Sequence, residues 1–117
     1  MKLELSIPPS VNNIYRRSRY GVYMTPKGKA WFEESIYEAR IQLDSWTTIT
    51  SDVSVKIEMF TCRSRDVDNV GKASLDLIAK HLQLIENDSQ VTDLRIVKYK
   101  VKKISEEKLT IEINLIN

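Results

Sequence analysis

Four stretches of the chain alternate hydrophobic with polar residues. The clearest alternation covers residues 53–60, and shorter or less regular ones cover residues 2–7, 91–103 and 109–115. Neighbouring side chains of a strand point to opposite faces of a sheet, so alternation is typical of a strand with one buried face. The pattern therefore predicts four strands.

Two other stretches show helical spacing. Thr25 followed by Pro26 indicates a helix start, and the apolar repeat after it predicts a helix to about Trp46. A second helix is predicted over residues 70–82, capped by Asp68 or Asn69. Its apolar residues recur every three or four positions, and on the other face a polar line recurs every four: Asp68, Lys72, Asp76 and Lys80.

The connections complete an α+β pattern. Residues 8–19 are rich in turn formers and predict a loop with room for one helical turn, and residues 20–24 predict a brief strand. A turn near residues 105–107 predicts that the last two long strands form a hairpin. Strand, loop, helix, strand, helix, strand, strand predicts one α+β domain over residues 1–117, with two helices on one face of a small mixed β-sheet.

Composition excludes several classes of protein. No apolar run reaches the roughly 20 residues that span a bilayer, and the N-terminus lacks the apolar core of a signal peptide, which predicts a cytoplasmic protein without membrane contact. The single cysteine, Cys62, has no partner for a disulfide or a zinc site, and we expect it at a strand end. His81 lies in the apolar arc of the second helix, which favours a structural role.

The distribution of charge along the chain is more informative than the net charge of +2. No acidic residue occurs from Leu5 to Phe32, a segment in which basic residues alternate with tyrosines that could stack on bases. This favours phosphate contact over a solvated surface. A second basic row, Lys98, Lys100 and Lys102, is more typical of a solvated edge strand. We predict DNA contacts for seven residues: Arg16, Arg17, Arg19, Lys27, Lys29, Arg63 and Arg65.

Between the two central hydrophobic runs lie Asp66, Asp68, Lys72 and Asp88. If Asp66 and Asp68 lie on extended backbone, their carboxylates face the same side and could hold a hard cation such as magnesium, together with a substrate phosphate. A capped helix start with a solvated face accounts for the same residues without any metal. Taken alone, the motif leaves both interpretations open.

In combination the motifs resemble the RusA family of Holliday-junction resolvases, endonucleases that cut four-way DNA junctions. The matching residues are Pro8-Pro9-Ser10 with Asn12 and Tyr15, Thr25 and Gly28, Asp66-Val67-Asp68-Asn69 with Lys72 and Asp76, and Asn87-Asp88-Ser89-Gln90. The resemblance covers the chain from Pro8 into the final strands. It departs at Asn87, where the family usually has an acid, and by one apparent extra residue between Lys80 and Asp88.

The resemblance implies a homodimer that depends on Mg²⁺ and acts on four-way junction DNA in recombination and repair, without a small-molecule cofactor. It implies that Asp66, Asp68 and Asp88 are metal ligands and that these three and Lys72 are the catalytic residues. Two alternatives stay open: a junction-binding or phage accessory protein with little nuclease activity, favoured by Asn87, and a hydrolase of small phosphate esters. The second gives the basic, tyrosine-rich segment no use.

Overall fold

The structure is a computed structural model, and it describes residues 1–116. Helices and strands alternate along the chain, with short helical turns at two connections. The elements in chain order are β1 (Lys2–Leu5), α1 (Val11–Ile14), β2 (Tyr15–Ser18), β3 (Gly21–Met24), α2 (Pro26–Leu43), β4 (Val53–Thr61), α3 (Asp68–Asp76), a π-helical segment (Leu77–His81), a 3₁₀ turn (Asp88–Gln90), β5 (Val91–Lys100), a second 3₁₀ turn (Ile104–Glu106) and β6 (Lys108–Leu115).

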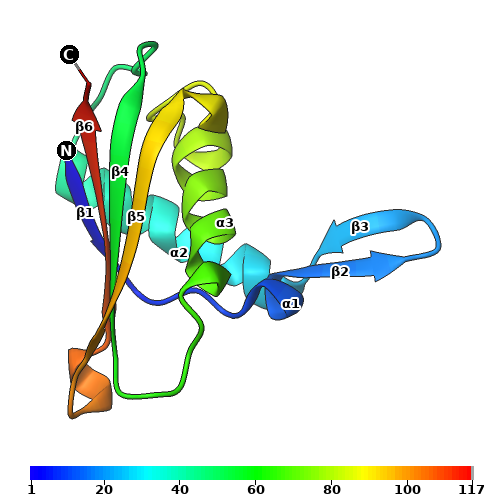
Figure 1. The fold of residues 1–117 in the computed structure, drawn as a ribbon. Helices are drawn as coiled ribbons and strands as arrows, with labels where there is room; N and C mark the ends of the chain where they lie inside the picture. The colour runs from blue at the N-terminus through cyan, green and yellow to red at the C-terminus, as the bar shows by residue number, and fades with distance from the viewer. Residues whose placement is uncertain (117) are drawn as a thin grey trace.

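Four strands form the main sheet in the order β1-β6-β4-β5 (Figure 1). β5 runs parallel to β4, as a strand does when a helix carries the chain back across the sheet, and that helix is α3. β6 is antiparallel to both β4 and β1. The sheet is therefore mixed, as the sequence pattern predicts.

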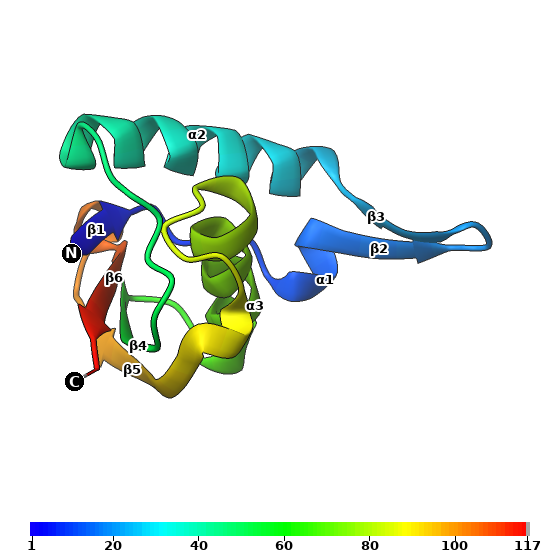
Figure 2. The same cartoon turned by 90° about the horizontal axis from the view of Figure 1, so that it is seen from above.

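One face of the sheet is buried under α2 and α3, which lie on the same side of it (Figure 2). The alternate residues of β4, from Val53 to Met59, are at most 1% exposed and pack in one core with Phe32 of α2 and Leu77 after α3. Two helices on one face of a mixed sheet confirm the predicted architecture. No helix in the described part of the chain is both long and apolar enough to cross a membrane.

The predicted hairpin of the last two strands is wrong. β4 lies between β5 and β6 and pairs with both, so the connection after Lys100 passes the end of β4 before β6 begins. β5 is left as an open edge of the sheet. Periodicity identified the buried faces of β1, β4 and β6, whereas β5 is mostly exposed and packs Val91 and Ile96 against the core. Periodicity carries no information on which strands are neighbours.

The first long helix begins where its sequence predicts. The Gly28 N–H donates to the Thr25 side chain at 3.1 Å, and Pro26 occupies the first turn. The helix ends at Leu43, three residues before the predicted Trp46, because Asp44 adopts a positive φ of 61°. A Cβ on Gly28 would lie 2.9 Å from the Ile14 side chain, so α2 can approach α1 this closely only with glycine there.

β2 and β3 pair only with each other and form a two-stranded arm that projects from the body (Figures 1 and 2). The strand at residues 20–24 was predicted, and so was the helical turn that became α1. The partner strand, Tyr15–Ser18, was not, because a strand with both faces in solvent shows no alternation. Below, "the arm" means residues 15–24.

The second long helix has the predicted buried face but a different start. Val70, Ala73, Leu77, Ile78 and Leu82 are all at most 5% exposed. The residue preceding the helix is Val67, already in helical conformation, so the prediction that Asp68 or Asn69 caps the helix is wrong. Leu82 N–H bonds to Leu77 O at 2.8 Å, which widens the last turn into the π-helical segment.

Candidate active site

Two carboxylates stand where the chain enters α3. Asp66 lies in the loop after β4 and Asp68 is the first residue of the helix, and both are exposed. Asp66 also lines a hollow of about 270 Å³, together with Ser10 and Asn69. The backbone between them is not extended, the condition under which the sequence would place both carboxylates on one side, because Val67 is helical. Among the described residues neither carboxylate has an ion-pair or side-chain hydrogen-bond partner, so both are available to a ligand.

The loop from β4 to α3 is held by residues outside it. Glu107 accepts hydrogen bonds from the Thr61 hydroxyl and the Cys62 N–H and pairs with Arg65 at 3.5 Å. The Thr61 hydrogen bond contributes most to lowering the pKa of Glu107, and Arg65 adds to it. From β5, the Lys98 ammonium group donates to the Arg65 carbonyl at 2.9 Å. These contacts fix the backbone that carries Asp66.

Four residues singled out in the sequence lie in or beside this loop. Cys62 lies directly after β4 and is exposed, which confirms its place at a strand end. The Arg65 guanidinium, a predicted DNA contact, is engaged by Glu107 and only 27% exposed. Lys98 is tied to the loop rather than being purely solvated. Arg63, by contrast, is exposed and lines a hollow of about 350 Å³ together with Lys98 and Lys100.

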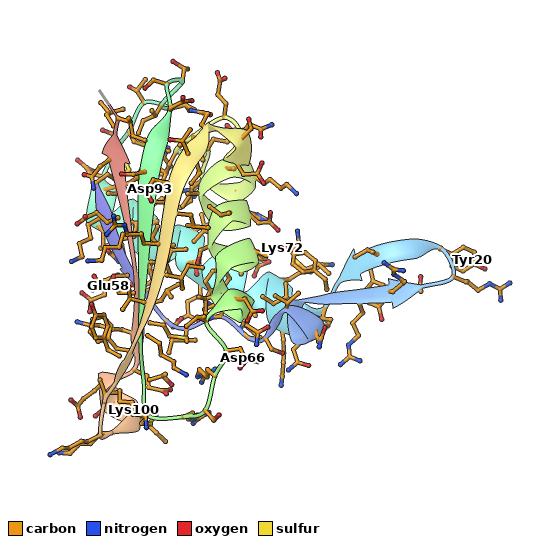
Figure 3. All side chains as sticks on the ribbon, viewed as in Figure 1. Tyr20, Glu58, Asp66, Lys72, Asp93 and Lys100 are labelled. Atoms are coloured by element: carbon orange, nitrogen blue, oxygen red, sulfur yellow. The ribbon has the colours of Figure 1, made fainter. Side chains whose placement is uncertain are left out.

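Lys72 lies one helical turn beyond Asp68 and so on the same side of α3. Figure 3 shows Asp66 at the start of this helix and Lys72 farther along it, toward the arm. The Lys72 side chain is 54% exposed, and its ammonium group lies 3.5 Å from Asp76 Oδ2. Lys72 is therefore paired within the protein and still accessible from solvent.

Asp76 is buried, so the interpretation of the polar line as a merely solvated face does not hold at this residue. Its side chain is 8% exposed and pairs with two lysines, Lys72 and Lys80. The Tyr15 hydroxyl donates to its Oδ2. Burial raises the pKa of Tyr15 well above its ordinary value, and the hydrogen bond to Asp76 and the charge of that carboxylate raise it further. The phenol therefore remains a hydrogen-bond donor at neutral pH and at the pH where an ordinary tyrosine would ionise.

The turn that carries Asp88 is held by hydrogen bonds of the Asn87 and Gln90 side chains. The Asn87 side chain accepts from the Ser89 N–H at 2.9 Å and caps the turn, a role that asparagine fills about as well as aspartate. The Gln90 side chain makes four hydrogen bonds: it accepts from the backbone N–H groups of Glu86 and Asn87 and donates to the carbonyls of Ile49 and Ser51. Asp88 is exposed on this fixed turn.

Within one chain, the turn with Asp88 does not meet the start of α3. Asp88 precedes β5, which begins beside the first residue of β4, whereas Asp66 follows the last residue of β4. A helix rises about 1.5 Å per residue, so the continuous helical stretch from Asp68 to His81 separates the two ends by roughly 20 Å. Accordingly, residues 1–116 contain no group of three acidic, histidine or cysteine side chains placed to hold one metal ion.

The arm carries the predicted arginine cluster. Arg16 and Arg17 lie on β2 and Arg19 lies at the turn, and all three are exposed. Tyr20 at the tip, labelled in Figure 3, is 88% exposed, with the Arg19 guanidinium 5.3 Å from its ring centroid. Lys27 and Lys29 are exposed in the first turn of α2, next to the base of the arm.

Sequence reasoning missed the residues that hold the others in place. The sequence marks Tyr15 as an aromatic for stacking and as part of a motif, Gln90 as part of a motif, and Glu107 as part of a turn. The contacts of Tyr15 and Glu107 have no local signal, because their partners lie 61 and 46 positions away in the chain. Gln90 has local partners in its turn, but its bond to Ile49 spans 41 positions. His81 does lie against the core, with its ring stacked 4.1 Å from that of Phe32, and burial lowers its pKa, as a structural histidine requires.

The sequence of this chain is similar to those of several known proteins. The family model described as "Endodeoxyribonuclease RusA" matches residues 6–115. A crossover junction endodeoxyribonuclease of Enterobacteria phage 82 is 34% identical over 113 residues, which cover 93% of this chain and 91% of the relative. The crossover junction endodeoxyribonuclease of Escherichia coli K12 is 33% identical with the same coverage. That of Enterobacteria phage HK97 is 30% identical over 95 residues, with 80% and 78% covered.

Proposed function

The chain belongs to the RusA family of endodeoxyribonucleases, and from this we propose that it resolves four-way DNA junctions by Mg²⁺-dependent cleavage of two phosphodiester bonds. The observation that carries the proposal is the start of α3, where two unpaired carboxylates, Asp66 and Asp68, stand one turn from Lys72. A basic arm beside this site supplies the contact surface for DNA.

The side chains fit a magnesium ion. Mg²⁺ prefers oxygen ligands and is usually bound through one or two carboxylates, with water and substrate phosphate completing its coordination. Asp66, Asp68 and Asp88 would hold the ion, which when bound lowers the pKa of a water and neutralises charge on the phosphate. Lys72 would stabilise the charge that develops on the phosphate or the leaving oxygen.

A homodimer accounts for the distance to Asp88. β5 is an open edge strand, and two copies of it could pair antiparallel about a two-fold axis. The beginning of one β5 would then lie beside the end of the other, which is where Lys98 contacts the loop of Asp66. Each site would combine Asp66, Asp68 and Lys72 of one protomer with the partner subunit's Asp88. Two such sites suit a junction with approximate two-fold symmetry.

Cleavage of a synthetic four-way junction tests the activity. We expect paired cuts on opposite strands with Mg²⁺, none with EDTA, and far slower cleavage of linear duplex of the same sequence. A protein that binds the junction tightly but leaves it uncut with Mg²⁺ would instead be a junction-binding module. The capping role of Asn87 supports the enzyme, because an acid is not needed there to form the turn that presents Asp88.

Mixed dimers test the shared site. Asp66→Asn and Asp88→Asn homodimers should each be inactive. If the site combines both subunits, a mixed dimer of the two contains one site with both substitutions and one with neither, so it should nick a single strand. If each site lies within one chain, both sites of the mixed dimer are damaged and no nick forms. Differently tagged subunits, co-expressed and purified in tandem, provide this dimer.

A further inference from the structure

Asp76 and Tyr15 form an ionisable pair that the proposed chemistry does not use. Asp76, the last residue of α3, has an 8% exposed side chain, and Tyr15 is half-buried at the base of the arm. A buried carboxylate costs free energy unless it is paired, and apolar residues would often stabilise the same place equally well. The core by itself therefore gives no reason for an acid here.

The contacts of the pair converge on Lys72. Its ammonium group lies 3.5 Å from Asp76 Oδ2, the same oxygen that accepts the Tyr15 hydroxyl hydrogen bond. It also lies 5.1 Å from the centroid of the Tyr15 ring, within the range of a cation–π contact. One side of the ammonium group thus faces a carboxylate and another faces an aromatic ring.

We propose that Asp76 and Tyr15 are positioning residues, which hold the ammonium group of Lys72 in the orientation needed to meet the phosphate that is cut. This inference rests on the proposed function. A lysine side chain has four rotatable bonds and loses up to about 2 kcal/mol of rotamer free energy when it is fixed. Fixing it before DNA binds removes that cost from the cleavage step.

The electrostatics of the cluster agree with this role. Lys80 pairs with the other oxygen, Oδ1, at 3.6 Å, so two ammonium groups face one carboxylate and leave one net positive charge. The cluster can therefore hold Lys72 and still attract a phosphate. The Lys72 side chain is 54% exposed, which keeps its ammonium group accessible to DNA.

Tyr15 adds a connection to the arm. It is the first residue of β2, so its hydrogen bond to Asp76 joins the base of the arm to the helix that carries Lys72. The phenol stays neutral at neutral pH because burial raises its pKa, so it donates its proton to the hydrogen bond with the carboxylate.

A double-mutant cycle on the single-turnover cleavage rate tests the proposal. Asp76→Asn keeps the shape and an acceptor for Tyr15 but removes the charge that holds Lys72, and we expect roughly tenfold slower cleavage with a junction Kd within twofold of the parent. In a Lys72→Ala background the same substitution should change the rate less than twofold. An equal loss in both backgrounds means that Asp76 acts only through the fold, and would overturn the proposal.

Lys108→Ala is the matched control, because Lys108 likewise pairs with a carboxylate, Glu4 at 3.6 Å, and lies over an aromatic ring, and its loss should leave the rate within twofold. Tyr15→Phe is the second variant in case Asp76→Asn does not fold. It keeps the ring and should slow cleavage roughly threefold, again only when Lys72 is present. A rate loss in Tyr15→Phe that persists in the Lys72→Ala background would also overturn the proposal.

Amine labelling separates this proposal from the proposed function, because it needs no cleavage. At limiting acetylating reagent, peptide mass spectrometry should show Lys72 modified roughly threefold faster in Asp76→Asn than in the parent, with Lys2 on the edge strand β1 unchanged. If Lys72 is labelled equally in both proteins, Asp76 does not hold it. If labelling responds but the parent never cuts junctions, the proposed function fails while the contact with Lys72 stands.

Discussion

The loop into α3 and the arm both carry residues proposed to meet DNA, but they are built in opposite ways. The loop is fixed from outside by Glu107 and by Lys98, whereas the strands of the arm pair only with each other and expose their arginines. Metal ligands must hold a geometry to fractions of an ångström, and phosphate contacts need mainly charge and reach. The difference indicates that chemistry belongs to the loop and affinity to the arm.

The sharpest test of this division is Asp68→Asn. It removes a proposed metal ligand, and losing several kcal/mol of transition-state stabilisation corresponds to roughly a thousandfold slower cleavage. Junction binding should stay the same or tighten, because one negative charge near the phosphates is gone. Single-turnover rates and gel-shift affinities measure the two effects. Cleavage at the parental rate in saturating Mg²⁺ would reduce Asp68 to a structural residue.

Substitutions in the arm should weaken DNA binding and leave the cleavage rate nearly unchanged. Replacing Arg16 and Arg17 with alanine removes two phosphate contacts, which should weaken junction binding roughly tenfold at moderate salt and reduce the slope of log K against log salt by about 1.8. The single-turnover rate at saturating protein should change little. Lys2→Ala with Arg40→Ala is the matched control, since it removes the same charge from exposed positions on β1 and α2. If the arm variant keeps the parental slope, the arm does not contact the phosphates.

Loosening the loop should have an intermediate effect. Glu107→Gln removes the charge that pairs with Arg65, and we expect several-fold slower cleavage with junction affinity unchanged. The pKa of Glu107 is lowered in the fold, so the stability it contributes is present above its ordinary value of 4.5 and is lost as the pH falls. The unfolding free energy of the parent should therefore fall more steeply below about pH 5 than that of Glu107→Gln. Parallel acid profiles would remove Glu107 from this role.

The smallest effect expected is at the base of the arm. The pKa of Tyr15 is raised above its ordinary value of 10.0, so its contribution to stability is complete below pH 10 and is lost as the pH rises further. Above pH 10 the unfolded chain releases a proton that the folded protein keeps. Denaturant unfolding should show the parent losing stability more steeply between about pH 10 and 11 than Tyr15→Phe. Identical alkaline slopes would contradict the buried hydrogen bond.

Much of the body could be predicted from the sequence because its signals are local. The alternation of β4 and the apolar repeat of α3 reflect which face is buried, and Thr25-Pro26 marks where α2 begins. The order of the strands could not be predicted, since β5 and β6 each suit β4 as a neighbour as well as each other. Of the two strands of the arm, β2 could not be predicted because solvent covers both of its faces.

The candidate site likewise has local features that the sequence predicts and long-range contacts that it does not. Asp66, Asp68 and Lys72 lie within seven positions of one another, and their spacing on one helix start could be predicted. The contacts of Asp76 with Tyr15 and of Thr61 with Glu107 join distant segments and have no signature in either segment. Nor does spacing along the chain indicate that α3 holds Asp88 far from Asp66.

The close contact of Gly28 with Ile14 also bears on how this fold can diversify. It fixes the base of the arm against α2, whereas Gly21 near the tip has no atoms within 4 Å of a Cβ position. Insertions or exchanges at the tip would therefore leave the packing of the body untouched. A nuclease built this way could change which DNA shapes it holds by altering a short surface ribbon, without any change to the residues that cut.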